Sequence, residues 1–73
     1  MNRSEVIKSL SANVDKVVRL SFNDGAVQTA KIHLVDDEGV VYWLVESNRV
    51  REEAACWTFF EDIEGVLPLG DSK

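Results

Sequence analysis

Apolar and polar positions alternate at period two along two stretches of this chain, residues 16–22 and residues 26–35. The turn sequence Asn23-Asp24-Gly25 separates them. Alternation of this kind is typical of strands that bury one face. Asp-Gly between two such runs is a strong hairpin signal, because glycine accepts the positive φ that the turn needs. We therefore predict a β-hairpin over residues 16–35.

Three further strands are predicted after this hairpin. A turn at residues 36–39, with Gly39 in the left-handed conformation, leads into the third strand. That strand is apolar on both faces, which favours cover on both sides. The predicted elements are a third strand over 40–46, a polar loop over 47–54, a fourth strand over 55–60, a 3-10 turn over 61–63, a fifth strand over 64–69 with Pro68 near its end, and a frayed tail over 70–73.

The first residues follow a helical pattern. An apolar stripe recurs at helical spacing over residues 2–14, and Asn2 with Glu5 has the form of a capping box. A helix over residues 2–14 that closes one end of the sheet is therefore expected. The members of the stripe are Val6, Ile7, Leu10 and Val14.

The order of these elements predicts one mainly β domain over residues 1–73, with a strongly bent barrel over residues 16–69. Closure into a barrel would hide the strand edges that otherwise invite aggregation. The predicted core contains Val18, Leu20, Phe22, Ala30, Ile32, Leu34, one face of residues 40–45, part of residues 57–60, Ile63 and Val66.

Three stretches make the chain similar to the Sm-like small barrels, including bacterial members with an N-terminal helix. They are Val18-Arg19-Leu20-Ser21-Phe22-Asn23-Asp24-Gly25, Lys31-Ile32-His33-Leu34-Val35-Asp36 and Glu61-Asp62-Ile63-Glu64-Gly65-Val66. They resemble the family's first strand with its Asp-Gly turn, its bent second strand ending in an acid, and its turn into the closing strand. The resemblance spans roughly residues 3–69 and implies an Sm-like fold.

The same resemblance bears on RNA binding. Sm-like proteins commonly form rings that bind single-stranded RNA through the loop after the second strand and the loop before the last strand. Those loops correspond here to residues 36–39 and 60–63. The family's loop Asn and its Arg-Gly or Lys-His pair are not matched, and besides Asp36, which corresponds to the acid that ends the second strand, four carboxylates stand in these loops instead. These are Asp37, Glu38, Glu61 and Asp62.

Composition narrows the class of protein. The chain has 73 residues, a formal net charge of −5 and one cysteine, Cys56. An acidic protein repels phosphate backbones at long range, and one thiol cannot form an internal disulfide. The sequence contains neither a signal-peptide pattern nor an apolar run long enough to cross a bilayer. We therefore expect a cytoplasmic protein with no membrane contact.

The residues that usually carry chemistry are few. His33 is the only histidine, and strand alternation directs it outward, opposite to Ile32. Cys56 lies in an apolar strand, where a thiol behaves as a small hydrophobe. The acids at residues 36–38 lack the spacing of a calcium loop. We predict no enzyme activity, catalytic residue, cofactor, metal site or small-molecule substrate.

The third and fourth predicted strands carry more apolar side chains than one barrel interior can bury. Tyr42, Trp43 and Trp57 are therefore the candidate interface residues, because aromatic residues are enriched at protein interfaces. The leading hypothesis is a non-enzymatic assembly module, a homo-oligomer that acts through protein–protein contacts. The alternatives are single-stranded RNA binding through Arg49 and Arg51, or an acidic nucleic-acid mimic that occupies the RNA site of a partner.

Overall fold

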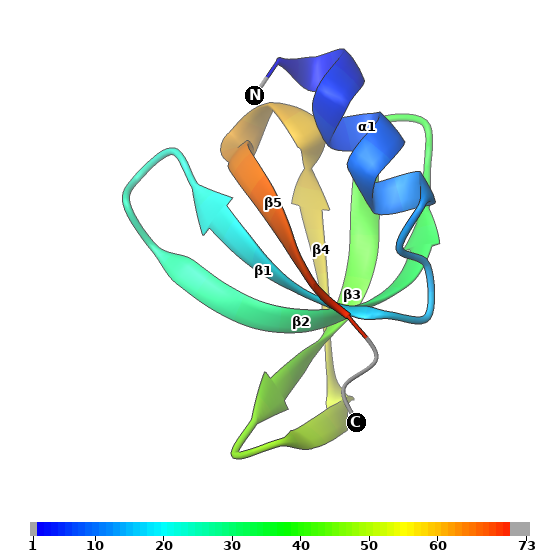
Figure 1. The fold of residues 1–73 in the computed structure, drawn as a ribbon, viewed down its shortest axis with the longest axis vertical. Helices are drawn as coiled ribbons and strands as arrows, with labels where there is room; N and C mark the ends of the chain where they lie inside the picture. Colours follow the sequence, from blue (N-terminus) through cyan, green and yellow to red (C-terminus); the bar gives the residue numbers. More distant parts are fainter. Residues whose placement is uncertain (1, 71–73) are drawn as a thin grey trace.

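One N-terminal helix and five antiparallel strands make up the fold, which is known from a computed structural model that describes residues 2–70 (Figure 1). This mainly β architecture confirms the predicted order of elements. The elements are α1 (Arg3–Ser11), β1 (Val17–Phe22), β2 (Val27–Val35), β3 (Gly39–Glu46), β4 (Arg49–Phe59), the 3-10 helix η1 (Phe60–Asp62) and β5 (Ile63–Gly70). Residues 71–73 of the predicted tail lie outside the described part of the chain.

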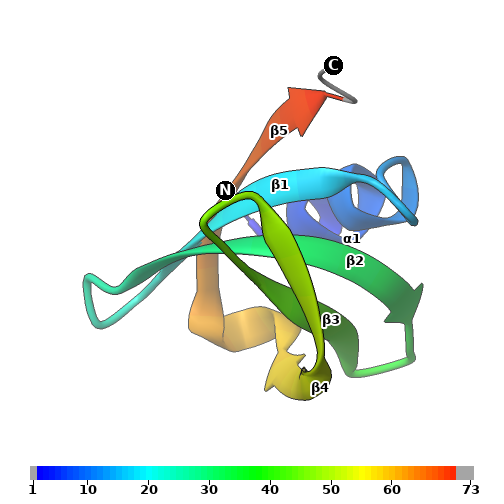
Figure 2. The ribbon, with the colours of Figure 1, turned by 90° about the horizontal axis from the view of Figure 1, so that it is seen from below.

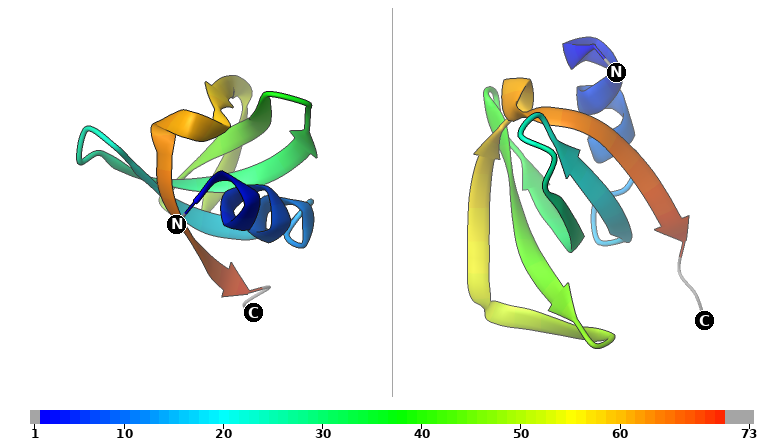
Figure 3. Two further views of the ribbon diagram at one scale, coloured as in Figure 1. Left: turned by 90° about the horizontal axis from the view of Figure 1, so that it is seen from above. Right: turned by 90° about the vertical axis from the view of Figure 1, so that its left-hand side faces the viewer.

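The strands form one sheet in the order β4-β3-β2-β1-β5, and the sheet is not closed. Within residues 2–70, β4 pairs only with β3 and β5 pairs only with β1. Figure 3 shows β4 and β5 diverging from η1 on opposite sides of the molecule, and Figure 2 agrees. The prediction that the strands close into a barrel is therefore wrong. Alternation specifies which face of each strand is buried, but closure also depends on strand tilt and stagger.

The core lies on the inner side of the bent sheet, where α1 covers one end. The helix packs against β5, β2 and η1 and contributes Val6 and Leu10 to the core. The Asn2–Glu5 capping box forms as predicted. The helix ends at Ser11 rather than residue 14, and Val14 is exposed. The fully buried strand residues include Val18, Leu20, Ala30, Ile32 and Val40, together with Phe60 of η1.

The β1–β2 hairpin forms as predicted. Gly25 has φ +93°, a conformation that L side chains rarely adopt. The Asp24 carboxylate accepts a hydrogen bond from the Ala26 backbone N–H at 2.9 Å. The Phe22 N–H donates to the Ala26 carbonyl at 2.8 Å and closes the end of the hairpin. Phe22 itself is only half-buried, so it packs against the predicted core from its margin and does not lie within it.

A bulge in β2 makes a second predicted core position, Leu34, wrong. Ile32 pairs with Tyr42, but the next paired residue of β2 is Leu34, opposite Val41, so His33 is the extra residue. A bulge breaks the alternation of faces beyond it. His33 is exposed as predicted, but Leu34 is also 43% exposed instead of buried.

The predicted polar loop over residues 47–54 is wrong, because most of it belongs to β4. Ser47 and Asn48 both adopt positive φ, 52° and 66°, and Glu46 pairs with Arg49. A two-residue turn with two positive φ values matches the twist of a hairpin. Three extra residues of β4, 52–54, then bulge out, and there β4 bends (Figure 3). Gly39 is not left-handed; it begins β3 opposite Phe59.

Candidate functional site

The outer side of β3 and β4, with the adjoining end of β2, carries a group of exposed and half-exposed apolar side chains. We call this group, Leu34, Val41, Trp43, Trp57 and Phe59, the aromatic face. The register places its members together: Val41 lies opposite Trp57, and Gly39 lies opposite Phe59. Trp57 and Phe59 are each 43% exposed. This is an apolar surface of the kind that marks interaction sites.

Gly39 explains how Trp57 lies on this face. A Cβ atom added at Gly39 would stand 2.6 Å from Cζ2 of Trp57 and closer still to the backbone oxygen of Thr58. The indole therefore packs directly against bare backbone. The Phe59 ring meets Trp57 edge-on, with ring centroids 4.5 Å apart and planes at 82°. This geometry is favourable for an aromatic pair and holds both rings in place.

Trp43 is more enclosed than Trp57, although the sequence singled out both. The His33 ring stacks on Trp43 with centroids 4.7 Å apart, and the Lys31 ammonium lies 5.9 Å from the centroid of the indole. The bulge in β2 is what brings His33 to this position. Trp43 is therefore half-buried by its own neighbours, and Trp57 with Phe59 offers the more accessible aromatic surface.

Tyr42 lies on the other side of the sheet from both tryptophans. It is 3% exposed and its hydroxyl group bonds to side chains of neighbouring strands. Of the three predicted interface residues, the structure brings Trp43 and Trp57 to one face and turns Tyr42 inward.

The edges of the open sheet are the second candidate surface. Among the described residues, neither β4 nor β5 has a partner on its outer side. Exposed apolar side chains stand on both strands, Trp57 and Phe59 on β4, and Leu67 and Leu69 on β5 at 55% and 40% exposure. The chain over residues 55–59 and over residues 65–69 contains no charged residue. Native edges are commonly protected by charge, and these two stretches carry none.

The arginines of the RNA hypothesis are placed differently. The Arg51 guanidinium bonds to Glu46 at 2.7 Å and to Glu53 at 2.5 Å. The hydrogen bond with Glu53 is the main cause that raises the pKa of Arg51. A hydrogen bond from its own backbone, followed by the bond from Arg51, lowers the pKa of Glu53. Arg51 is thus already neutralised by its own chain, while Arg49 is exposed on the same hairpin.

The two loops of the Sm-like resemblance do come together. The Phe60 N–H donates to the Glu38 carbonyl at 3.0 Å, which joins the turn before β3 to η1. The Arg3 guanidinium lies 5.8 Å from the centroid of the Phe60 ring and donates to the Asp37 carbonyl at 3.4 Å. This surface is therefore acidic at its side chains, with one arginine from α1.

The residues examined for catalysis or metal binding lie apart. Cys56 is half-buried, and its thiol donates to the Ala54 carbonyl at 3.5 Å. Over residues 2–70, no three His, Cys, Asp or Glu side chains gather as a metal site would require. The one helix in that range is too short to span a bilayer.

Sequence reasoning missed a polar cleft inside the bend of the sheet, lined in part by Gln28, Tyr42 and Thr58. A signal for it was present, because Gln28 and Thr58 stand at inward-facing strand positions that the core pattern reserves for apolar residues. Register confirms this placement: Gln28 pairs with Leu20, and Thr58 pairs with Val40.

We compared the chain with protein-family models, with curated proteins and with solved structures, and none of the three gave a match.

Proposed function

We propose that this chain is a non-enzymatic assembly module that binds further copies of itself, edge to edge, through β4 and β5. The observation that carries the proposal is an open sheet whose two outer edges have no strand partner within residues 2–70. Each edge strand bears exposed apolar side chains and an uncharged stretch, residues 55–59 of β4 and residues 65–69 of β5. A protein with a net charge of −5 repels its own copies. Contact through these uncharged stretches keeps like charges apart.

The occupant that fits both edges is a second copy of this chain. The exposed apolar side chains are Trp57 and Phe59 on β4, and Leu67 and Leu69 on β5. If the outer edge of β4 in one copy pairs with the outer edge of β5 in another, in antiparallel or parallel orientation, the backbone hydrogen-bond ladder of the sheet continues from one copy into the next. Burying the exposed half of each of these side chains contributes roughly 1 kcal/mol. Pro68 has no N–H, so pairing with β5 is expected to rely mainly on residues 63–67.

We also propose that the sheet is an Sm-like small barrel in an open form. The N-terminal helix, the five antiparallel strands and the 3-10 turn immediately before the last strand support this assignment. The RNA-binding alternative has less support, because Arg51 is paired with two glutamates and acidic residues occupy the loops that the family uses.

Light scattering after size-exclusion chromatography tests the proposal. The wild-type chain at micromolar concentration is expected to give a mass above that of one chain. Leu67→Lys and Trp57→Lys are each expected to shift the mass toward the monomer, because a desolvated lysine opposes docking at either edge. Val27→Lys is the matched control, since Val27 is 57% exposed, close to the 55% of Leu67, but lies on β2. A monomeric wild type would refute self-assembly.

A mixing experiment tests the edge-to-edge arrangement. If β4 of one copy pairs with β5 of another, Trp57→Lys and Leu67→Lys are monomers alone but form a one-to-one dimer when mixed. Each mutant retains the edge that the other has lost. If either mutant alone still forms a dimer, the interface joins two like edges instead.

A further inference from the structure

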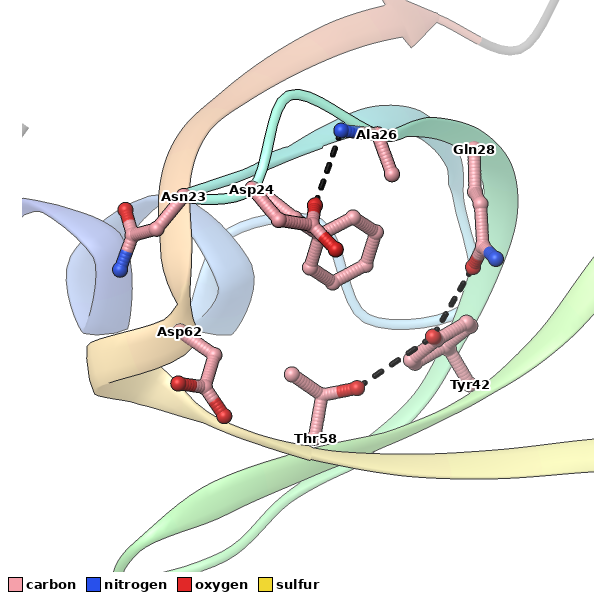
Figure 4. A pocket seen from close by; sticks show the side chains of 8 residues that line it. Asn23, Asp24, Ala26, Gln28, Tyr42, Thr58 and Asp62 are labelled. Carbon is pink, nitrogen blue, oxygen red and sulfur yellow. Dashed lines mark hydrogen bonds between the residues drawn. The ribbon is translucent and has the colours of Figure 1, made fainter.

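A cleft of about 520 Å³ opens on the inner side of the sheet, between the β1–β2 turn, the strands β3 and β4, and η1 (Figure 4). It is separate from the aromatic face, which lies on the outer side of the same strands. Its lining residues are Phe22, Asn23, Asp24, Ala26, Gln28, Tyr42, Thr58 and Asp62.

One wall of the cleft is a chain of neutral polar groups. The Tyr42 hydroxyl donates to Oε1 of Gln28 at 3.0 Å and lies 3.3 Å from Oγ1 of Thr58. Because a phenol has a single hydrogen, Thr58 is the donor in the second bond. The three groups come from three strands and hold one another in place. This wall therefore keeps its shape without a ligand.

The opposite wall is acidic. Figure 4 shows Asp24 on the β1–β2 turn at the top of the cleft and Asp62 on η1 at its lower left, both across the space from Tyr42 and Gln28 on the right. One oxygen of Asp24 accepts the Ala26 N–H, whereas the Asp62 carboxylate has no hydrogen-bond or ion-pair partner among residues 2–70. Of the residues that the structure describes, no lysine, arginine or histidine lines the cleft. The cleft thus holds two negative charges and no positive one.

We propose that this cleft binds a small organic cation, an ammonium or guanidinium group attached to an apolar body. The cationic group would lie against Asp24 and Asp62, with its N–H groups donating to the carboxylates. The apolar body would contact the Phe22 ring and the Ala26 methyl group, which also line the space. The volume suits such a ligand, since small-molecule pockets measure about 300–1,000 Å³. This inference does not depend on self-assembly, and it adds a ligand that the sequence analysis did not predict.

Benzamidine, a cation at neutral pH, is the probe, and neutral benzamide is its control. Because the two compounds have nearly the same shape, a difference in their binding reports the effect of the positive charge. Both are titrated into the 15N-labelled full chain and followed by amide chemical shifts. Benzamidine is expected to move the signals of residues 23–26, 42, 58 and 62, and benzamide is expected to bind at least about tenfold more weakly. Equal binding of the two, or no shift with benzamidine up to the limit of solubility, would overturn the proposal.

Two variants of η1 supply the matched pair. Asp62→Asn removes a carboxylate that lines the cleft, and Glu61→Gln removes the adjacent one, which does not line it. Asp62→Asn is expected to weaken benzamidine binding about tenfold, while Glu61→Gln leaves it within about twofold. Unchanged dispersion of the amide spectrum shows that both variants fold. An equal effect of the two substitutions would mean that benzamidine binding depends only on the net charge of the protein, which would contradict the proposed site.

The cation could be a free amine or an arginine side chain of another protein. Agmatine, a guanidinium cation, represents the free small molecule, and the blocked peptide acetyl-Ala-Arg-Ala-amide represents the arginine side chain of a protein. Tighter binding of agmatine supports a free cation, tighter binding of the peptide supports a protein side chain, and binding of neither overturns the proposal.

Discussion

The two sides of β3 and the strands beside it are both rich in apolar residues, yet they have opposite surroundings. Val40 and Tyr42 face the inner side and are almost fully buried under the bend of the sheet. Trp57 and Phe59 on the outer side remain 43% exposed, because α1 packs against β5, β2 and η1. The core therefore accounts for the apolar residues of the inner side, and those of the outer side are left available to a partner.

Neighbouring residues of β2 should show this difference most strongly. Ile32→Ala removes a fully buried side chain and is expected to lower the free energy of unfolding by about 2–5 kcal/mol. Leu34→Ala removes a side chain that the bulge leaves 43% exposed, and about 1 kcal/mol or less is expected. Urea unfolding followed by tryptophan fluorescence measures both. Equal losses would contradict the bulge at His33.

Gly39 tests the packing of the aromatic face. Gly39→Ala places a Cβ in contact with the Trp57 ring and the Thr58 carbonyl, and about 1–3 kcal/mol of destabilisation is expected. Gly65→Ala is the control, because a Cβ there meets nothing within 4 Å. The same urea titration compares them, and a Gly39→Ala protein as stable as the Gly65→Ala protein would show that Trp57 does not lie on this backbone.

Tyr42 gives the inner side of the sheet a pH dependence. Burial, the largest cause, raises the pKa of Tyr42 above its ordinary value of 10.0. The neutral phenol is therefore favoured by folding. Its contribution is fully present below pH 10 and is lost as the pH rises through the higher folded-state pKa. Urea midpoints measured from pH 8 upward should fall at the alkaline end for wild type and fall less for Tyr42→Phe. Parallel curves would contradict this.

The smallest effect is expected at the tip of the β3–β4 hairpin. Arg51 forms its ion pairs with Glu46 and Glu53 at the surface, where the three side chains are 42%, 61% and 66% exposed and such pairs contribute little to stability. Arg51→Gln should leave the urea midpoint unchanged within error, with or without added salt. A clear loss that salt abolishes would show that this hairpin is held by charge rather than by its turn and ladder.

Local pattern was enough to predict the β1–β2 hairpin, the helix cap and most of the core. Asp24-Gly25 specifies a turn by its own backbone and side-chain preferences, and period-two burial of Val18, Leu20 and Ile32 follows from strand geometry. The errors came where backbone geometry departs from simple alternation. The bulge at His33 turned Leu34 outward, and the Ser47-Asn48 turn extended β4 into a region that looked like a charged loop.

The candidate sites were likewise predicted from the sequence only in part. The sequence indicated an excess of apolar side chains over strands 3 and 4 and identified Trp57, because composition and alternation are local properties. Only the tertiary structure decided that Tyr42 faces inward to Gln28 and Thr58, that among residues 2–70 the outer edges of β4 and β5 have no strand partner, and that Asp24 and Asp62 border one cleft. Each of these depends on strand register and on the bend of the whole sheet, which bring together residues far apart in the chain.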